Sequence, residues 1–166
     1  MRLTRVIGHV STLALGIALT LALPAASAGC SRADAAEALP AIKLGMSPRD
    51  VRARFEPSTQ GSWTTKIGSS PGDDTILEWV AADTTSARIT TAKFEFHLGM
   101  LVAIRAHLRE PVAAEAIALT AKTVTSRAPA GSNAGAGSDL VVLARDCPTH
   151  RDEAEAVASR STKPRS

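Results

Sequence analysis

The chain has no tyrosine and few other aromatic residues, and this scarcity excludes one class of binding protein. Phe, Trp and Tyr together make up 3% of the 166 residues. Single-stranded nucleic acids are bound on platforms of stacked aromatic rings, for which this chain has too few. The net charge of +3 does not favour nucleic acid either, because residues 40–158 carry 13 Lys and Arg against 14 Asp and Glu, a net charge of −1. We therefore expect no nucleic-acid partner.

Long apolar runs and familiar catalytic motifs are also missing. The main apolar stretch, residues 13–23, is shorter than the ~20 residues that a membrane-spanning helix needs. The sequence has no Gly-x-Ser-x-Gly nucleophile elbow, no phosphate-binding loop and no dinucleotide-binding glycine motif. His97 and His107 fall several residue pairs apart in the hairpin predicted below, too far to share a metal ion. We therefore expect a protein that is not an enzyme and that has no cofactor and no metal.

Residues 1–29 have the pattern of an export signal. Arg2 and Arg5 precede the apolar stretch, Pro24 ends it, and a run of small residues follows. This order is typical of a secretory signal peptide. It predicts that the mature protein lies on the periplasmic side of a bacterial cell envelope or is secreted.

Only two cysteines are present, Cys30 and Cys147, and they leave three interpretations open. Ser27-Ala28-Gly29-Cys30 resembles the bacterial lipoprotein signal, in which the cysteine is acylated and anchors the protein to a membrane, here the outer membrane. Alternatively, cleavage before Gly29 would leave Cys30 to form a disulfide with Cys147. A third interpretation is a reactive thiolate at Cys147, three residues before His150.

The length allows one ordinary domain. We expect a signal peptide over residues 1–29, a tether over 30–40, a single folded domain over 41–159 and a disordered tail over 160–166. The domain opens on a strongly specified helix: Ser47 is a suitable N-cap, Pro48 suits the first helical position, and Asp50 completes a capping box.

Alternating apolar and polar residues then predict strands. Residues 75–82 read as one strand, and residues 87–108 as a hairpin with a three-residue loop, 97–99, which places Phe94 opposite Val102. The alanine-rich segment 111–126 predicts a helix, residues 140–143 a short strand, and a capping box at Thr149 and Asp152 a last helix to about residue 159. The expected fold is α+β: an antiparallel sheet of three to four strands with helices packed on one face, plus a C-terminal helix-strand-helix extension over 110–159.

Two motifs resemble those of a known family. Lys43-x-Gly45-Met46-Ser47-x-x-x-Val51 and Phe96-x-x-Gly99-x-Leu101-Val102 resemble the SmpA/OmlA (BamE-like) small bacterial envelope lipoproteins, over about residues 41–109. The resemblance implies helices on a three-stranded antiparallel sheet, a layout shared with beta-lactamase-inhibitor-like domains. It also implies a non-catalytic role in protein interaction, of which outer-membrane barrel assembly is the best-known case. The segment 57–61 reads as loop where the family has a second helix.

The polar face of the predicted hairpin is the best candidate contact surface. It carries Lys93, Glu95, Arg105, His107 and Arg109, of which the basic residues are the candidate contacts. Trp63 either adds an aromatic anchor to them or closes the core beside Trp79. We expect an exported lipoprotein that binds other envelope proteins through these residues. The alternative is a soluble periplasmic or secreted inhibitor or ligand-binding protein with a Cys30–Cys147 disulfide.

Overall fold

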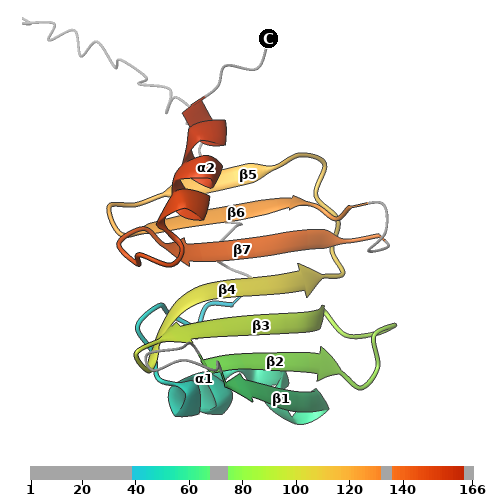
Figure 1. Ribbon diagram of the computed structural model, residues 1–166. Helices are drawn as coiled ribbons and strands as arrows, with labels where there is room; N and C mark the ends of the chain where they lie inside the picture. Colours follow the sequence, from blue (N-terminus) through green and yellow to red (C-terminus); the bar gives the residue numbers. More distant parts are fainter. Residues whose placement is uncertain (1–38, 68–74, 132–135, 163–166) are drawn as a thin grey trace, which may run out of the picture.

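A computed structural model describes residues 39–67, 75–131 and 136–162. Its elements in chain order are α1 (Pro48–Arg54), the 3-10 helix η1 (Glu56–Gln60), β1 (Gly61–Ile67), β2 (Thr75–Ala81), β3 (Ile89–His97), β4 (Met100–Leu108), β5 (Ala116–Leu119), β6 (Thr123–Pro129), β7 (Ser138–Ala144) and α2 (Arg151–Thr162). The strands form one antiparallel sheet in the order β1-β2-β3-β4-β7-β6-β5 (Figure 1).

The N-terminal predictions fall largely outside this description. The expected signal peptide and Cys30 both lie outside the described residues, and so do residues 163–166 of the expected tail. The first described residue, Leu39, is 8% exposed and belongs to the main core, so the folded part includes the end of the expected tether. No helix within the described ranges is long and apolar enough to cross a membrane.

The sheet has two faces, which the pairing of its strands defines. Residues directly opposite each other on neighbouring strands point to the same side. On the back face, Leu77, Phe94 and Ile104 lie in one row across β2, β3 and β4. On the front face, Glu95, Ala103 and Leu143 lie in one row across β3, β4 and β7.

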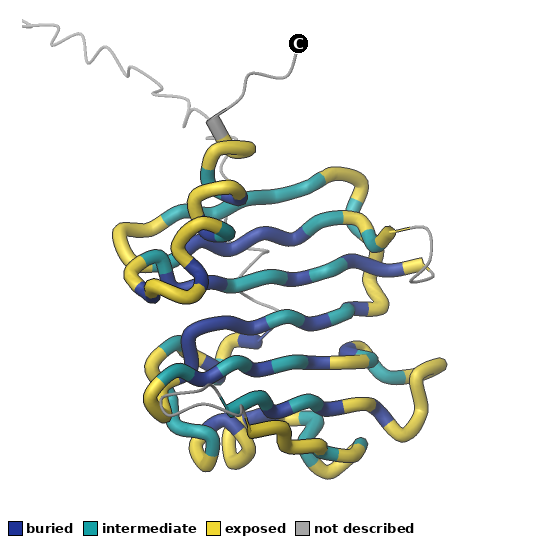
Figure 2. Tube along the Cα trace, viewed as in Figure 1, coloured by how far each residue is buried: buried dark blue, intermediate teal, exposed yellow. Residues whose placement is uncertain are grey.

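The back face carries the main core, which α1 and η1 cover over the β1–β4 half of the sheet. α1 begins as predicted, because the Ser47 side chain accepts a hydrogen bond from the backbone N–H of Asp50 at 3.2 Å, and Pro48 occupies the first turn. Phe55, directly after α1, is 2% exposed. Its ring lies 5.0 Å from Trp79 and 5.3 Å from Phe94, both in edge-to-face geometry. Figure 2 shows the buried residues concentrated on the central strands.

The front face is covered at the other half of the sheet. α2 packs on β5, β6 and β7 through Ala154 and Val157, which form a second core with Ala103, Val124 and Leu143. In Figure 1, α2 lies in front of this half, and α1 lies at the opposite end of the sheet. Each helical layer therefore covers a different half of a different face.

The predicted fold class is wrong in two respects. In the part of the chain that the structure describes, the sheet has seven strands instead of three to four, and the helices lie on both faces instead of one. The helix-strand-helix extension is instead a strand-strand-strand-helix unit that continues the sheet through the β4–β7 pair. This extension is possible because β4 has an unpaired edge after the first four strands, and β7 satisfies its backbone groups.

The predicted helix over 111–126 is the clearest local error, because this segment forms β5 and the start of β6. The alanine content favours helix, but Thr123, Val124 and Thr125 are β-branched and suit a strand. The turn between the strands is fixed locally: the backbone N–H of Thr120 donates to the carbonyl of Thr123 at 2.9 Å, and the N–H of Thr123 donates to Oγ1 of Thr120 at 2.9 Å. Pairing of β6 with β7 therefore outweighs the helix propensity of this segment.

The β3–β4 hairpin is present, but its predicted three-residue loop is wrong. His97 pairs with Met100, so that the loop contains only Leu98 and Gly99. Both have positive φ, 51° and 77°, as a two-residue type I′ turn requires. Leu101 and Val102 then oppose Phe96 as a β-bulge, after which Phe94 pairs with Ile104 instead of Val102.

Leu98 offers a direct test of this turn. Leu98 is 70% exposed, so burial of its side chain offsets little of the energetic cost of its left-handed backbone conformation. We expect Leu98→Asn to raise the free energy of unfolding by about 0.5–1 kcal/mol, because Asn adopts positive φ more easily. Urea unfolding of Leu98→Asn and of Leu98→Ala measures the effect. Equal stability of the two variants would contradict it, since both lose the same apolar contacts and only Asn relieves the strain.

Candidate functional site

The structure brings three of the five predicted surface residues together on the front face. Lys93 on β3 and Arg105 on β4 lie directly opposite each other, and His107 lies in the next row, opposite Thr91. Arg109 follows the end of β4, where its backbone N–H donates to the carbonyl of Arg88 at 2.9 Å. These residues line one continuous region, as the hairpin pattern predicted.

Trp63 does not belong to this surface, because it lies on the back face. Its ring centroid is 5.5 Å from Phe55, and its Nε1–H donates to Oγ of Ser58 at 3.1 Å. The guanidinium of Arg52 stacks over the ring at 5.4 Å. Trp63 therefore closes the edge of the core between β1 and η1, beside its cross-strand neighbour Trp79.

The predicted basic surface is neutralised by two acids: Glu95, which strand alternation places on the same face, and Glu153 of α2, which it does not. Nζ of Lys93 lies 3.1 Å from Oε1 of Glu95, and Nε of Arg105 lies 3.0 Å from the same oxygen. Arg105 also donates two hydrogen bonds to Glu153 of α2, from its two terminal nitrogens at 2.7 and 2.6 Å. This bidentate pair ties the first turn of α2 to the middle of the sheet.

The network shifts the pKa values of its members in directions that keep them charged. Burial raises the pKa of Glu95, but hydrogen bonds from Arg105 and Lys93 outweigh it and hold that pKa below its usual value. The hydrogen bond from Arg105 is the main cause of the lowered pKa of Glu153. The same bond, which outweighs the opposing effect of burial, raises the pKa of Arg105.

His150, just before α2, is the second residue of this network that sequence reasoning missed. It is 7% exposed. Its Nε2 lies 3.4 Å from Glu95 and its Nδ1 lies 3.8 Å from Glu153, while Nε2 is buried without a hydrogen bond. Its proximity to Cys147 in sequence suggested a thiol–imidazole pair. The thiol of Cys147 is instead a free, buried group packed with Val102 and Ala144.

A second, smaller polar cluster surrounds His107. Its Nδ1 lies 2.8 Å from Oδ1 of Asp139, directly across the β4–β7 pair. The backbone approaches the ring at Gly137, where a Cβ atom would lie 2.9 Å from Nε2 of His107 and 2.4 Å from the carbonyl oxygen of Leu108. Only glycine fits this position without a shift of the backbone.

The uncovered front face is hollowed beside α2. A groove of about 500 Å³ crosses β2, β3, β4 and β7. Side chains on its floor and walls include Glu78, Val80, Thr91, Lys93, Arg105, His107, Asp139 and Val141. An adjoining hollow of about 640 Å³ extends the groove past His107 to Arg109, between residues 84–85 and Ala136. Apolar, hydroxyl and ion-paired groups thus alternate over one open concave surface.

The described part of the chain holds no group of three His, Cys, Asp or Glu residues that could bind a metal ion. His107 and His150 on the front face each lie beside carboxylates, and within the same residues neither of these two imidazoles has a hydroxyl or thiol hydrogen-bond partner that it could activate.

Comparisons with protein-family models, with curated proteins and with solved structures find no match to this chain.

Proposed function

We propose that this protein is an exported, non-catalytic module of the bacterial cell envelope that binds another envelope protein through the front-face groove. The observation that carries the proposal is the unequal covering of the sheet. α2 covers the front of β5–β7, and the turn before it reaches Glu95 of β3, whereas no described helix packs on the front of β1 and β2. There Val80 is 45% exposed at the groove, with Thr91 beside it.

The ion pairs of the groove support a protein partner over a polyanion. Lys93, Arg105 and His107 each have a carboxylate within 3.1 Å on the same face. Charges already held by internal partners present fixed hydrogen-bonding groups, and less side-chain freedom is lost when a partner binds. A polyanion would need a patch of cations without acidic partners, and these residues do not form one.

Anchoring belongs to the same proposal. The resemblance to envelope lipoproteins and the Ser27–Cys30 segment support acylation of Cys30, which would hold the folded domain at the periplasmic side of the outer membrane through a short tether. Intact mass and N-terminal analysis of the mature protein from its producing cell test this. A mature chain that begins at an acylated Cys30 is the expected result, and an unmodified thiol at that position would overturn the anchor.

The soluble alternative keeps one specific observation in its favour. Cys147 is a free thiol in the turn between β7 and α2, 5% exposed, and a second cysteine in an oxidising compartment could pair with it. A mature protein whose mass falls short of the reduced mass by two hydrogens, and rises on reduction, would establish the Cys30–Cys147 disulfide in place of the anchor.

Site-specific photo-crosslinking tests the binding surface. We expect a crosslinker at Thr91, in the groove, to give one defined adduct with an envelope protein in the producing cell. The same crosslinker at Ala121, an exposed residue of the β5–β6 turn, serves as the matched control and should give none. The second-site change Val80→Arg should lower the Thr91 adduct at least tenfold, since a long charged side chain obstructs the groove. Equal adducts at both positions, or none at Thr91, would refute the groove as the binding site.

A further inference from the structure

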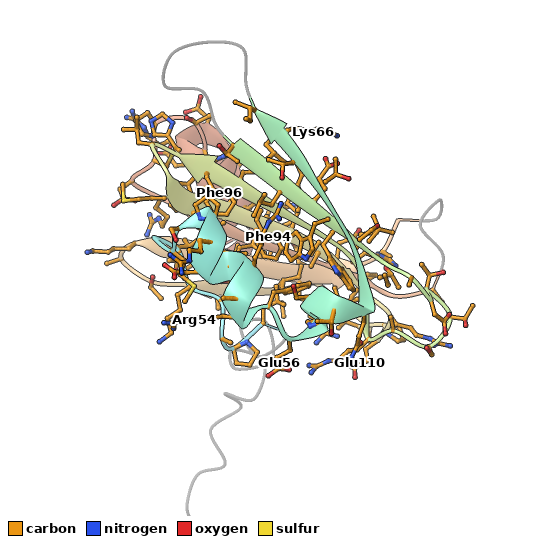
Figure 3. All side chains as sticks on the ribbon, turned by 90° about the horizontal axis from the view of Figure 1, so that it is seen from below. Arg54, Glu56, Lys66, Phe94, Phe96 and Glu110 are labelled. Atoms are coloured by element: carbon orange, nitrogen blue, oxygen red, sulfur yellow. The ribbon has the colours of Figure 1, made fainter. Side chains whose placement is uncertain are left out.

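A second hollow lies on the back of the molecule, away from the groove. It has a volume of about 240 Å³ and is enclosed between the N-terminal segment 39–42, the junction of α1 with η1, and the residues before β3. Its lining consists of Leu39, Pro40, Ala41, Ile42, Arg54, Glu56, Pro57, Gln60, Ala87, Arg88 and Ile89. Figure 3 views the molecule from below, with Arg54 and Glu56 labelled at the C-terminal end of α1.

The floor of this pocket is apolar. Leu39, Ile42 and Ile89 are each less than 9% exposed, and all three belong to the main core. A ligand that enters the pocket therefore contacts side chains that the fold itself keeps in place. Each methylene group that it buries there contributes about 0.8 kcal/mol to binding.

The rim is charged, and its cations differ from those of the front face. The guanidinium groups of Arg54 and Arg88 are exposed, and within the described ranges neither has a side-chain hydrogen bond or ion pair. Lys93 and Arg105, by contrast, are held by Glu95 at about 3 Å. Two unpaired arginines above an apolar floor form the complement of a carboxylate that carries an apolar tail.

We propose that this pocket binds a small aliphatic monocarboxylate, with the carboxylate at Arg54 and Arg88 and the tail on Leu39, Ile42 and Ile89. Glu56 on the same rim disfavours a second negative charge on the ligand and is placed to accept an ammonium group. Two sources share this chemistry: a short fatty acid, and an apolar α-amino acid whose ammonium group meets Glu56. The pocket lies on the opposite face from the groove, and the two share no lining residue. An experiment can therefore disprove the proposal for one site without bearing on the other.

A ligand titration followed by NMR tests the proposal. We expect hexanoate to shift the methyl signals of Leu39, Ile42 and Ile89 in a saturable way, with a Kd on the order of 1 mM for so small a ligand. Norleucine distinguishes the two sources: tighter binding than hexanoate favours the amino acid, and weaker binding the fatty acid. Hexanamide, which has the same tail with a neutral amide in place of the carboxylate, should not saturate.

Matched variants locate the contact. Arg88→Gln and Arg54→Gln should each weaken hexanoate binding about tenfold, because each removes a charge-assisted hydrogen bond. Arg151→Gln, an exposed arginine of α2 outside the pocket, should leave it unchanged. Absence of saturable shifts in the wild-type protein, equal weakening by all three variants, or equal binding of hexanamide would each overturn the proposal.

Discussion

Replacing Phe55 by alanine is expected to lower the free energy of unfolding by about 3–5 kcal/mol, the cost of removing a buried aromatic side chain. Phe55 lies where α1 meets η1, and its ring makes edge-to-face contacts with Trp63, Trp79 and Phe94 at centroid distances of 5.0–5.5 Å. No other residue of the helical layer contacts three aromatic rings among those that the structure describes. Its loss would release α1 and η1 from the back face of the sheet.

Urea unfolding followed by tryptophan fluorescence measures this effect, because both tryptophans of the chain lie against Phe55. Phe55→Leu is the matched control: it keeps most of the apolar volume, and we expect it to cost about 1–1.5 kcal/mol. A cost below 2 kcal/mol for Phe55→Ala would show that the layer is held elsewhere, for example by Leu39 and Ile42.

The sequence predicted the elements whose signals are local. The start of α1 was found because its cap, its proline and its capping acid all lie within four residues. The structure confirms Ser47 as the cap and Pro48 in the first turn, and the carboxylate of Asp50 accepts from Oγ of Ser47 at 2.8 Å. Alternation found β2, β3 and β4 for the same reason. Such short-range patterns survive folding because tertiary contacts reinforce them.

The predictions that failed depended on distant partners. Segment 111–126 has the composition of a helix, yet β7 presents it with an open edge and it forms strands. The predicted register of the β3–β4 hairpin is wrong because it was chosen only to pair apolar residues with apolar residues, in a ladder without a bulge. A two-residue loop followed by a bulge at Leu101 and Val102 also pairs apolar residues with apolar residues, with Phe94 opposite Ile104. Side-chain polarity alone does not distinguish the two registers.

For the same reason, the sequence predicted the strand residues of the candidate site but not the residues that the helix contributes. Lys93, Arg105 and His107 share a face by strand alternation alone. Glu153 joins Arg105 from 48 residues further along the chain, and its sequence context, the first turn of a helix, suggested only a favourable dipole interaction. A network assembled across the sheet and a helix cannot be derived until the helix is placed on the correct face.

Replacing Arg105 by methionine is expected to lower the free energy of unfolding by about 2–3 kcal/mol at neutral pH. The change leaves the side chain of Glu95, which is 12% exposed, without its main partner, and it removes both hydrogen bonds to Glu153. Breaking one side of a fully buried ion pair costs about 3–5 kcal/mol, and the partial exposure of Arg105 and Glu153 reduces that figure. α2 should be the first element to loosen.

Thermal unfolding and amide hydrogen exchange of α2 measure the two parts of this effect. Arg109→Met is the matched control, since Arg109 is exposed and its side chain has no ion pair within the described ranges. We expect Arg109→Met to change stability by less than about 0.5 kcal/mol. Comparable losses in both variants would mean that the network does not hold α2.

Acid titration separates the ion network from simple packing of the Arg105 side chain. Glu95 and Glu153 have pKa values below the usual 4.5 in the folded protein, so that their contribution is fully present above pH 4.5 and is lost as the pH falls through the folded values. Arg105 makes the largest contribution to both decreases, and without it only Lys93 opposes the effect of burial on the pKa of Glu95. The stability difference between the wild-type protein and Arg105→Met should therefore be largest near pH 7 and shrink toward pH 3. A difference that is independent of pH would assign the whole effect of Arg105 to packing.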